Sequence, residues 1–173
     1  MSNANKYITG LLGRLRIVDF DNSEPNRWIF HDSGEGDDAE EFTIEIYQSD
    51  GWVTFTSVIM INLQGGKLAQ FYEALFRLNH YLNGFKLGVT TNGDYITLQT
   101  DMNIAHLDLV QLKNTLLQFR AFYSQYYSSI VEFAQELGLK FRKSTRKPSA
   151  ADIMWNRLIK GRDSTALVKR TDR

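Results

Sequence analysis

The sequence predicts an α+β fold in which an antiparallel five-stranded sheet has helices packed on one face. Three observations support this prediction. Residues 105–137 lack proline and glycine and carry apolar side chains every three or four positions, as an amphipathic helix does. Asp50-Gly51 and Asn92-Gly93 each lie between segments of alternating apolar and polar residues, which is typical of β-hairpins. Residues 67–83, between the hairpins, repeat the helical spacing.

The elements follow in the order α-β-β-β-α-β-β-α. Residues 3–16 favour a short helix, although two glycines weaken it. A loop at residues 19–26 precedes a short strand at 27–31, and residues 32–41 form an acidic loop before the first hairpin. Gly84 stands where a left-handed cap would end the middle helix.

The turn residues fix the register of both hairpins, because a two-residue turn leaves one pairing. The predicted pairs are Ser49 with Trp52, Ile46 with Phe55, Ile44 with Ser57, Phe42 with Ile59, Val89 with Ile96, and Leu87 with Leu98. Each hairpin then has one apolar face and one polar face. This arrangement is typical of an antiparallel sheet that is covered on one side only.

The long helix carries an unusually wide apolar stripe. Its first row consists of Leu109, Leu112, Leu116, Phe119, Tyr123, Tyr126, Ile130, Phe133 and Leu137. A second row consists of Val110, Leu117, Phe122, Tyr127 and Val131. Such a helix needs a sheet, another helix or a second subunit to cover it.

Charge divides the chain into two regions, a domain at residues 1–139 and a basic C-terminal extension at 140–173. The extension holds 11 lysines and arginines against 3 acidic residues, whereas residues 1–139 hold 9 against 17. We expect residues 140–148 to be solvated and mobile. A tail helix should follow, because Ser149 and Asp152 form a capping box after Pro148.

Composition excludes several classes of protein. No apolar run approaches the roughly 20 residues of a membrane-spanning helix, so we expect no integral membrane segment. The absence of cysteine excludes disulfides and thiolate metal sites. No secretory signal is evident at the N-terminus, and a cytoplasmic location is the simplest expectation.

No constellation of residues indicates catalysis, a cofactor or a metal. Gly65-Gly66-Lys67 lacks the first glycine and the hydroxyl residue of a phosphate-binding loop. The acidic residues at 37–41 lack the spacing of a calcium-binding loop. The histidines, His31, His80 and His106, fall on three different elements. We therefore expect no enzyme activity.

Two groups of side chains are candidates for binding a partner. The first is an aromatic cluster on the long helix: Phe119, Phe122, Tyr123, Tyr126 and Tyr127. Core packing or an interface would explain it, because these rings cover more than one helical face and tyrosine is enriched at interfaces. The second lies in the extension: Arg146, Lys147, Trp155, Arg157 and Leu158. It suits a solubilising tail, a binder of nucleic acid or anionic surfaces, or a docking element for an acidic protein.

Several segments together resemble the type III secretion chaperone-like fold, and within it the YbjN family. They are Asp50-Gly51-Trp52 with the strand at 53–61, residues 77–83, Phe85-Lys86-Leu87 and the tyrosine-rich last helix. The resemblance covers about residues 5–138, and the basic extension departs from it. It implies a bacterial, non-enzymatic binder, often homodimeric, that holds or regulates other proteins.

We therefore expect a protein-binding adaptor, chaperone-like or regulatory, that forms a homodimer through its surplus of aromatic side chains. The alternative is a nucleic-acid or anionic-surface binding module that uses the basic tail. The tail helix could dock on its own body, on a partner subunit or on an external acidic protein. We favour the external partner, because the basic linker is long.

Overall fold

The computed structural model describes residues 3–33, 41–90 and 95–143. The strands are β1 (Phe20–Asp21), β2 (Arg27–Ser33), β3 (Glu41–Ser49), β4 (Trp52–Gln64), β5 (Lys86–Val89), β6 (Tyr95–Asn103) and β7 (Lys140–Lys143). The helices are α1 (Asn3–Arg14), α2 (Leu68–Leu78), α3 (Leu109–Phe122) and α4 (Ser128–Glu136). Short 3₁₀ turns form η1 (Asn79–Tyr81) and η2 (Ile104–His106), and a π-helical segment, η3 (Tyr123–Tyr127), joins α3 to α4.

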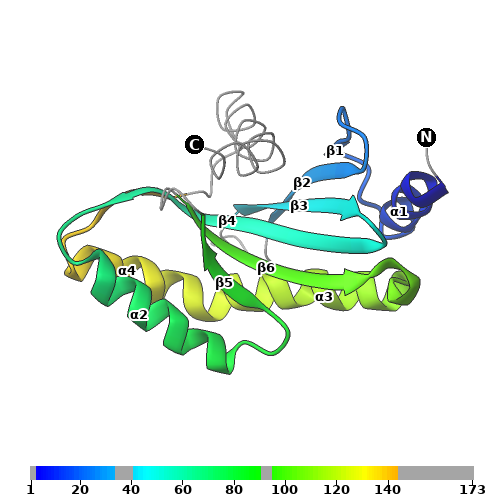
Figure 1. The fold of residues 1–173 in the computed structure, drawn as a ribbon. Helices are drawn as coiled ribbons and strands as arrows, with labels where there is room; N and C mark the ends of the chain where they lie inside the picture. The colour runs from blue at the N-terminus through cyan, green and yellow to red at the C-terminus, as the bar shows by residue number, and fades with distance from the viewer. Residues whose placement is uncertain (1–2, 34–40, 91–94, 144–173) are drawn as a thin grey trace, which may run out of the picture.

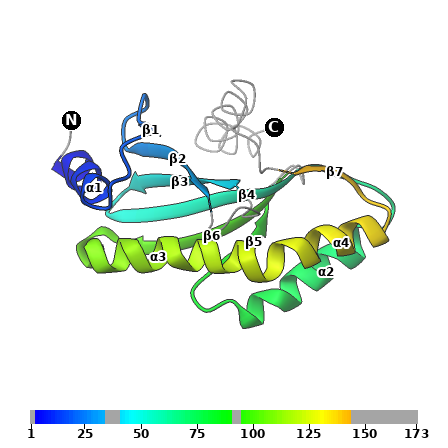
Figure 2. The ribbon, with the colours of Figure 1, turned by 180° about the vertical axis from the view of Figure 1, so that it is seen from behind.

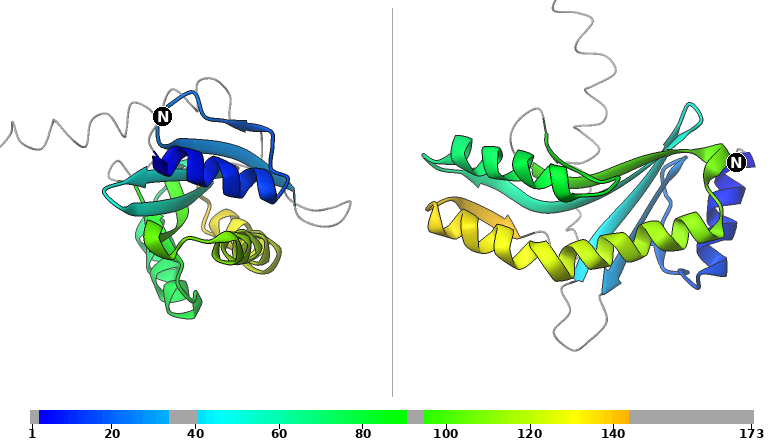
Figure 3. Two further views of the ribbon diagram at one scale, coloured as in Figure 1. Left: turned by 90° about the vertical axis from the view of Figure 1, so that its right-hand side faces the viewer. Right: turned by 90° about the horizontal axis from the view of Figure 1, so that it is seen from below.

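The chain forms one antiparallel sheet with helices against it, which confirms the predicted α+β class (Figure 1). Neighbouring strands follow the order β1-β2-β3-β4-β6-β5, and β7 also pairs with β4. The sheet therefore has seven strands, and the prediction of five is wrong. Helices α2 and α4 lie side by side below the sheet, and α1 lies across one end of α3 (Figure 3).

The two unpredicted strands, β1 and β7, are short. Phe20 of β1, which lies in the segment that was expected to be a loop, pairs with Phe30 of β2. Lys143 and Lys140 of β7 pair with Met60 and Gln64 of β4 (Figure 2). The expectation of a solvated and mobile segment at 140–148 is wrong for residues 140–143 in that they pair with β4, although three of their four side chains are exposed.

The first hairpin has the predicted register over the pairs that the sheet forms. Ser49 pairs with Trp52 and Ile46 with Phe55. Asp50 and Gly51 both have positive φ, 49° and 80°, as the tight turn requires. Pairing of β3 with β4 ends at Glu45 and Thr56, short of the predicted outer pairs.

The second hairpin also has the predicted register. Leu87 pairs with Leu98 and Val89 with Ile96. The turn at Asn92-Gly93 lies outside the described residues, so its type stays a prediction. Gly84 has a φ of 76°, as predicted, but it follows the 3₁₀ turn η1 rather than an α-helix.

The long helix begins later than predicted and contains a π-helical turn. Asp108 caps its start by accepting a hydrogen bond from the Gln111 amide at 2.7 Å. Beyond Phe119 the buried residues are Phe122, Tyr123, Tyr127, Ile130, Val131 and Ala134. The buried side therefore combines residues of both predicted rows, and the π-helical turn η3 lies within it. Tyr126, Phe133 and Leu137 of the predicted first row are only half-buried.

Candidate protein-binding surface

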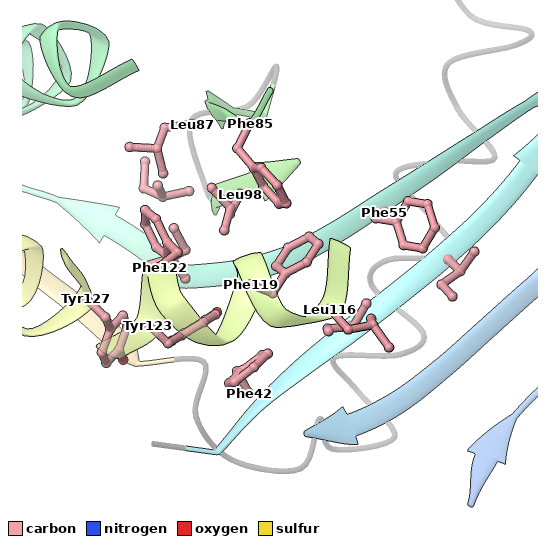
Figure 4. Packing of buried hydrophobic residues seen from close by; sticks show 14 of the residues in the cluster. Phe42, Phe55, Phe85, Leu87, Leu98, Leu116, Phe119, Phe122, Tyr123 and Tyr127 are labelled. Atoms are coloured by element: carbon pink, nitrogen blue, oxygen red, sulfur yellow. The ribbon is translucent and has the colours of Figure 1, made fainter. Parts of the chain in front are cut away.

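Four of the five rings in the predicted aromatic cluster belong to the core. The four are Phe119, Phe122, Tyr123 and Tyr127, and Tyr126 is half-buried. Figure 4 shows the rings between the helix and the sheet. Tyr123 stacks on Phe42 with ring centroids 4.1 Å apart, and Phe119 meets Phe85 edge-on at 4.8 Å. Core packing therefore accounts for these rings, and each of the four is at most 4% exposed, which leaves a partner almost no surface.

The Tyr123 hydroxyl lies at a gap along one edge of β4. β3 occupies this edge over residues 52–56 and β7 over residues 60–64. Between them, Ser57 Oγ donates to Thr43 O at 2.7 Å, and Tyr123 Oη lies 2.8 Å from Ser57 Oγ and 3.3 Å from Val58 O. Either hydroxyl can be the donor between Ser57 and Tyr123, and the Tyr123 hydroxyl also donates to Val58 O. The core tyrosine thus links the helix to two strands.

A second link joins α3 to β2. Arg120 Nε lies 3.2 and 3.0 Å from the two carboxylate oxygens of Asp32, and its Nη2 lies 2.9 Å from Asp32 Oδ1. The Asp32 side chain is 9% exposed and that of Arg120 is 37% exposed. This bidentate pair and the Tyr123 hydroxyl fix the helix against the sheet, so the opposite face of the sheet rests on a rigid support.

The predicted binding residues of the extension lie outside the described residues. They are Arg146, Lys147, Trp155, Arg157 and Leu158. The predicted tail helix lies there too. Their role in binding a partner stays a prediction.

One face of the sheet is not covered by any helix of the described chain (Figures 1 and 3). Side chains alternate along β4, where residues 53, 55 and 57 are buried and residues 54, 56 and 58 are half-buried. Neighbouring strands extend this uncovered surface, which we call the open face. Its central residues are Ile29, Thr43, Thr54, Thr56, Val58 and Thr97.

The open face presents β-branched side chains and balanced charge. By the strand alternation, its charged residues are Asp21, Glu41, Glu45 and Asp101 against Arg27, Lys86, Lys140 and Arg142. Asp101 accepts a hydrogen bond from Thr54 Oγ1 at 2.7 Å. The face therefore combines methyl groups with polar groups, several of which pair with one another, and it carries no excess of either sign.

Arg27 illustrates how these charges are paired. Its Nε and Nη2 donate to the two carboxylate oxygens of Glu45 at 3.0 and 3.1 Å, and Nη1 donates to Glu24 at 2.8 Å. Burial alone would lower the pKa of Arg27, but the hydrogen bonds and charges of Glu45 and Glu24 outweigh it and the pKa is raised. Arg27 stays charged, and its guanidinium group binds carboxylates of its own chain, those of Glu45 and Glu24.

Two aromatic side chains stand at the hairpin end of the open face. Tyr47 pairs with Thr54 and Trp52 pairs with Ser49, so the two rings are diagonal neighbours on adjacent strands. Trp52 is 53% exposed and Tyr47 is 38% exposed. Exposed tyrosine and tryptophan beside aliphatic groups are typical of protein interfaces.

Other exposed apolar residues form smaller groups. Phe76 and Tyr81 lie on α2 and η1, and Val110 and Leu117 lie seven residues apart on α3. Each pair is confined to one helix or to a helix and the turn that follows it, whereas the open face spans four strands. The open face is therefore the strongest candidate for a protein-binding surface.

The described residues also set limits on other functions. Among them, no group of three histidine, aspartate or glutamate side chains could hold a metal ion. His31, His80 and His106 lie on β2, η1 and η2. In the same part of the chain, no helix is long and apolar enough to cross a bilayer.

Comparison with known proteins identifies a fold and no family. No protein-family model matches the chain, and no curated protein matches its sequence. A chain of the ExsC–ExsE complex matches with a TM-score of 0.50 and 11% identity, over 74% of this chain and 96% of that chain. A chain of the HopA1–SchA chaperone–effector complex matches with a TM-score of 0.46 and 10% identity, over 77% and 91%. The first likeness shows a fold shared with a chain of that two-protein complex.

Proposed function

We propose that this chain is a non-enzymatic protein-binding adaptor, chaperone-like or regulatory, whose open face receives the partner. The observation that carries the proposal is a four-stranded, β-branched face with no helix of the described residues over it and two exposed aromatic rings at its end. The fold that it shares with a chain of a two-protein complex supports this function. Membership of the YbjN family and a bacterial cytoplasmic location are finer parts of the same proposal.

The open face also indicates the chemistry of the partner segment. Because its charges balance, affinity must come from apolar contact with Val58, Ile29 and the threonine methyl groups. The partner segment is therefore amphipathic and nearly neutral where it meets the sheet. An acidic region elsewhere on the partner would suit the basic extension, as the sequence predicts.

A photo-crosslinking amino acid at Thr56, on the open face, tests this proposal in the native cell. Gln118 is the matched control, because it is polar and exposed on α3, on the opposite side of the molecule. We expect a discrete, nuclease-resistant protein adduct from position 56 and none from position 118. Equal adducts from both positions would contradict the assignment of the face.

Binding of nucleic acid or an anionic surface through the basic extension is the second candidate function. It is favoured by the three exposed basic residues of β7, Lys140, Arg142 and Lys143, which begin the extension at the edge of the sheet. The same crosslinking experiment distinguishes it. A position-56 adduct that disappears after nuclease treatment would support nucleic acid as the partner and contradict the adaptor proposal.

Self-association is a separate part of the proposal. The aromatic surplus that suggested a homodimer is mostly buried, so a dimer would have to use rings that remain exposed, such as Phe76 and Tyr81. Light scattering at micromolar concentration measures the mass. A dimer that dissociates in a Phe76→Ser, Tyr81→Ser variant would support this surface, and a monomeric wild-type mass would exclude it.

A further inference from the structure

We propose that residues 149–160 of this chain dock as a helix on the chain's own open face. Trp155, Leu158 and Ile159, which share one side of the predicted tail helix, would face the sheet. The docking itself requires no partner. Its consequence, competition between the tail and a partner for the open face, rests on the proposed function.

The route of the chain at the end of β7 is the first argument. β3 and β7 both run antiparallel to β4 along the same edge, since β6 occupies the other edge of β4. The end of β7, at Lys143 opposite Met60, therefore points at the start of β3, where Ser57 bonds to Thr43. The chain cannot continue in line, because β3 stands in its path, and it must leave the plane of the sheet.

The helix-covered side of the sheet is closed at this point. Tyr123 fills the gap beside Ser57 and Val58, and Lys143 Nζ lies over the Tyr127 ring, 6.0 Å from its centroid. Both rings are buried. The nearest surface that the described helices leave uncovered is the open face, on the other side of β4.

The lengths of the segments agree with this docking. Residues 144–148 can span at most about 17 Å when extended. A helix of residues 149–160 is about 18 Å long. The open face measures about 20 Å along β4 from Trp52 to Val58. The linker can therefore carry the helix onto the face, and the helix can cover it from Val58 toward Trp52.

The chemistry of the two surfaces predicts how docking responds to salt. Charges on the open face balance, so the basic residues of the tail find no net attraction there. The methyl groups of Val58 and the threonines meet the apolar side of the helix, while Arg157 and Lys160 remain on the solvent side. Docking should therefore persist at about 1 M salt, where the Debye length is about 3 Å.

Paramagnetic broadening in the full-length chain tests the docking. The chain has no cysteine, so Asp163→Cys gives a single site for a nitroxide label just beyond the tail helix. We expect the amide signals of Thr54, Thr56 and Thr97 to lose more than half of their intensity, at low salt and at about 1 M salt alike. The signal of Gln118, on the opposite side, should keep its intensity. Unaffected signals from the open face, or broadening only at low salt, would overturn the proposal.

Two controls complete the test. A Trp155→Ser, Leu158→Ser variant of the labelled chain should restore the open-face signals without changing the melting temperature. Broadening in a mixture of labelled unenriched chain with unlabelled ¹⁵N chain would show a second copy on the face and overturn docking within one chain. The labelling experiment contains no partner protein. A negative result would therefore contradict tail docking and would not affect the crosslinking test of partner binding at Thr56.

Discussion

The side chain of Asn79 closes part of the free edge of β5, and removing it tests how the sheet is terminated. Asn79 Nδ2 donates to Leu87 O at 3.0 Å, and Asn79 Oδ1 accepts from the Leu87 amide at 2.6 Å. The amide group thus takes the place of one residue of a further strand. Edge strands with unpaired backbone groups are templates for pairing with another chain.

We expect Asn79→Ala to lower the free energy of unfolding by about 2–3 kcal/mol. Each of the two hydrogen bonds contributes about 0.5–1.5 kcal/mol net, and each backbone group of Leu87 that loses its partner while buried costs about 1–3 kcal/mol. Leu87 is only 3% exposed, although water at the edge of the sheet limits the penalty. In a chain of this size, 1 kcal/mol shifts the melting temperature by about 2–4 °C, so we expect a fall of about 4–12 °C.

Urea unfolding followed by circular dichroism measures the change, with two comparison variants. Asn83→Ala makes the same substitution at an exposed position four residues later and should stay within about 0.5 kcal/mol of the wild type. Asn79→Asp keeps the acceptor for the Leu87 amide but loses the donor, so its stability should lie between those of Asn79→Ala and Asn83→Ala. Hydrogen exchange at Leu87 should accelerate in Asn79→Ala. Equal stability of the two alanine variants, with unchanged exchange at Leu87, would refute the reasoning.

Three further predictions use the same unfolding assay. Tyr123→Phe removes a hydroxyl from the gap beside β4 and should cost about 1–2 kcal/mol, whereas half-buried Tyr126→Phe should cost less than about 0.5 kcal/mol. Truncation after Lys143 should change stability by less than about 1 kcal/mol, whereas truncation after Leu139 should cost about 2–4 kcal/mol through the lost pairing of β7. Gly65→Ala places a Cβ 2.8 Å from the Leu139 side chain at a φ of 145° and should cost about 1–3 kcal/mol. Equal stability of the two tyrosine variants would contradict the role of the Tyr123 hydroxyl, and equal stability of the two truncated chains would contradict the role of β7. A Gly65→Ala variant as stable as the wild type would contradict the close contact with Leu139.

Hairpin register is the part of the fold that local sequence chemistry determines best. Asp50-Gly51 fixes the pairing of its two strands, because only residues that tolerate positive φ fit the turn. The buried side of α2 is equally local, since Phe71 and Leu75 follow helical spacing. The residues at 77–83 that carry the family resemblance also have a structural role, because Asn79 ties the end of this helix to β5.

Strand β7 could not be predicted for a physical reason. Lys140-Phe141-Arg142-Lys143 lacks an apolar alternation, and its partner on β4 lies about 80 residues away in sequence. Only Phe141 among the four is half-buried, so its pairing depends on backbone hydrogen bonds that leave no trace in composition. The charge change at residue 140, from which the domain boundary was predicted, therefore coincides with the start of a strand.

The aromatic cluster shows why the sequence left both core packing and an interface open. Phe119 and Tyr123 belong to the first apolar row of the long helix, whereas Phe122 and Tyr127 belong to the second. All four are buried, so the buried side of the helix is wider than either row. The sequence contains both rows, but it does not show how much of the helix the sheet covers.

The same contacts favour a partner on the face of the sheet over a partner at the edge of β5 or at the edge of β4 beyond β3. Asn79 occupies backbone groups of β5 that an added strand would use, and β7 with Tyr123 occupies the edge of β4 beyond β3. The open face has no comparable obstruction among the described residues, and the chain leaves β7 beside it. A partner that binds there must bury apolar surface with little help from charge, so mutations such as Val58→Asp should weaken binding far more than a change in salt concentration would.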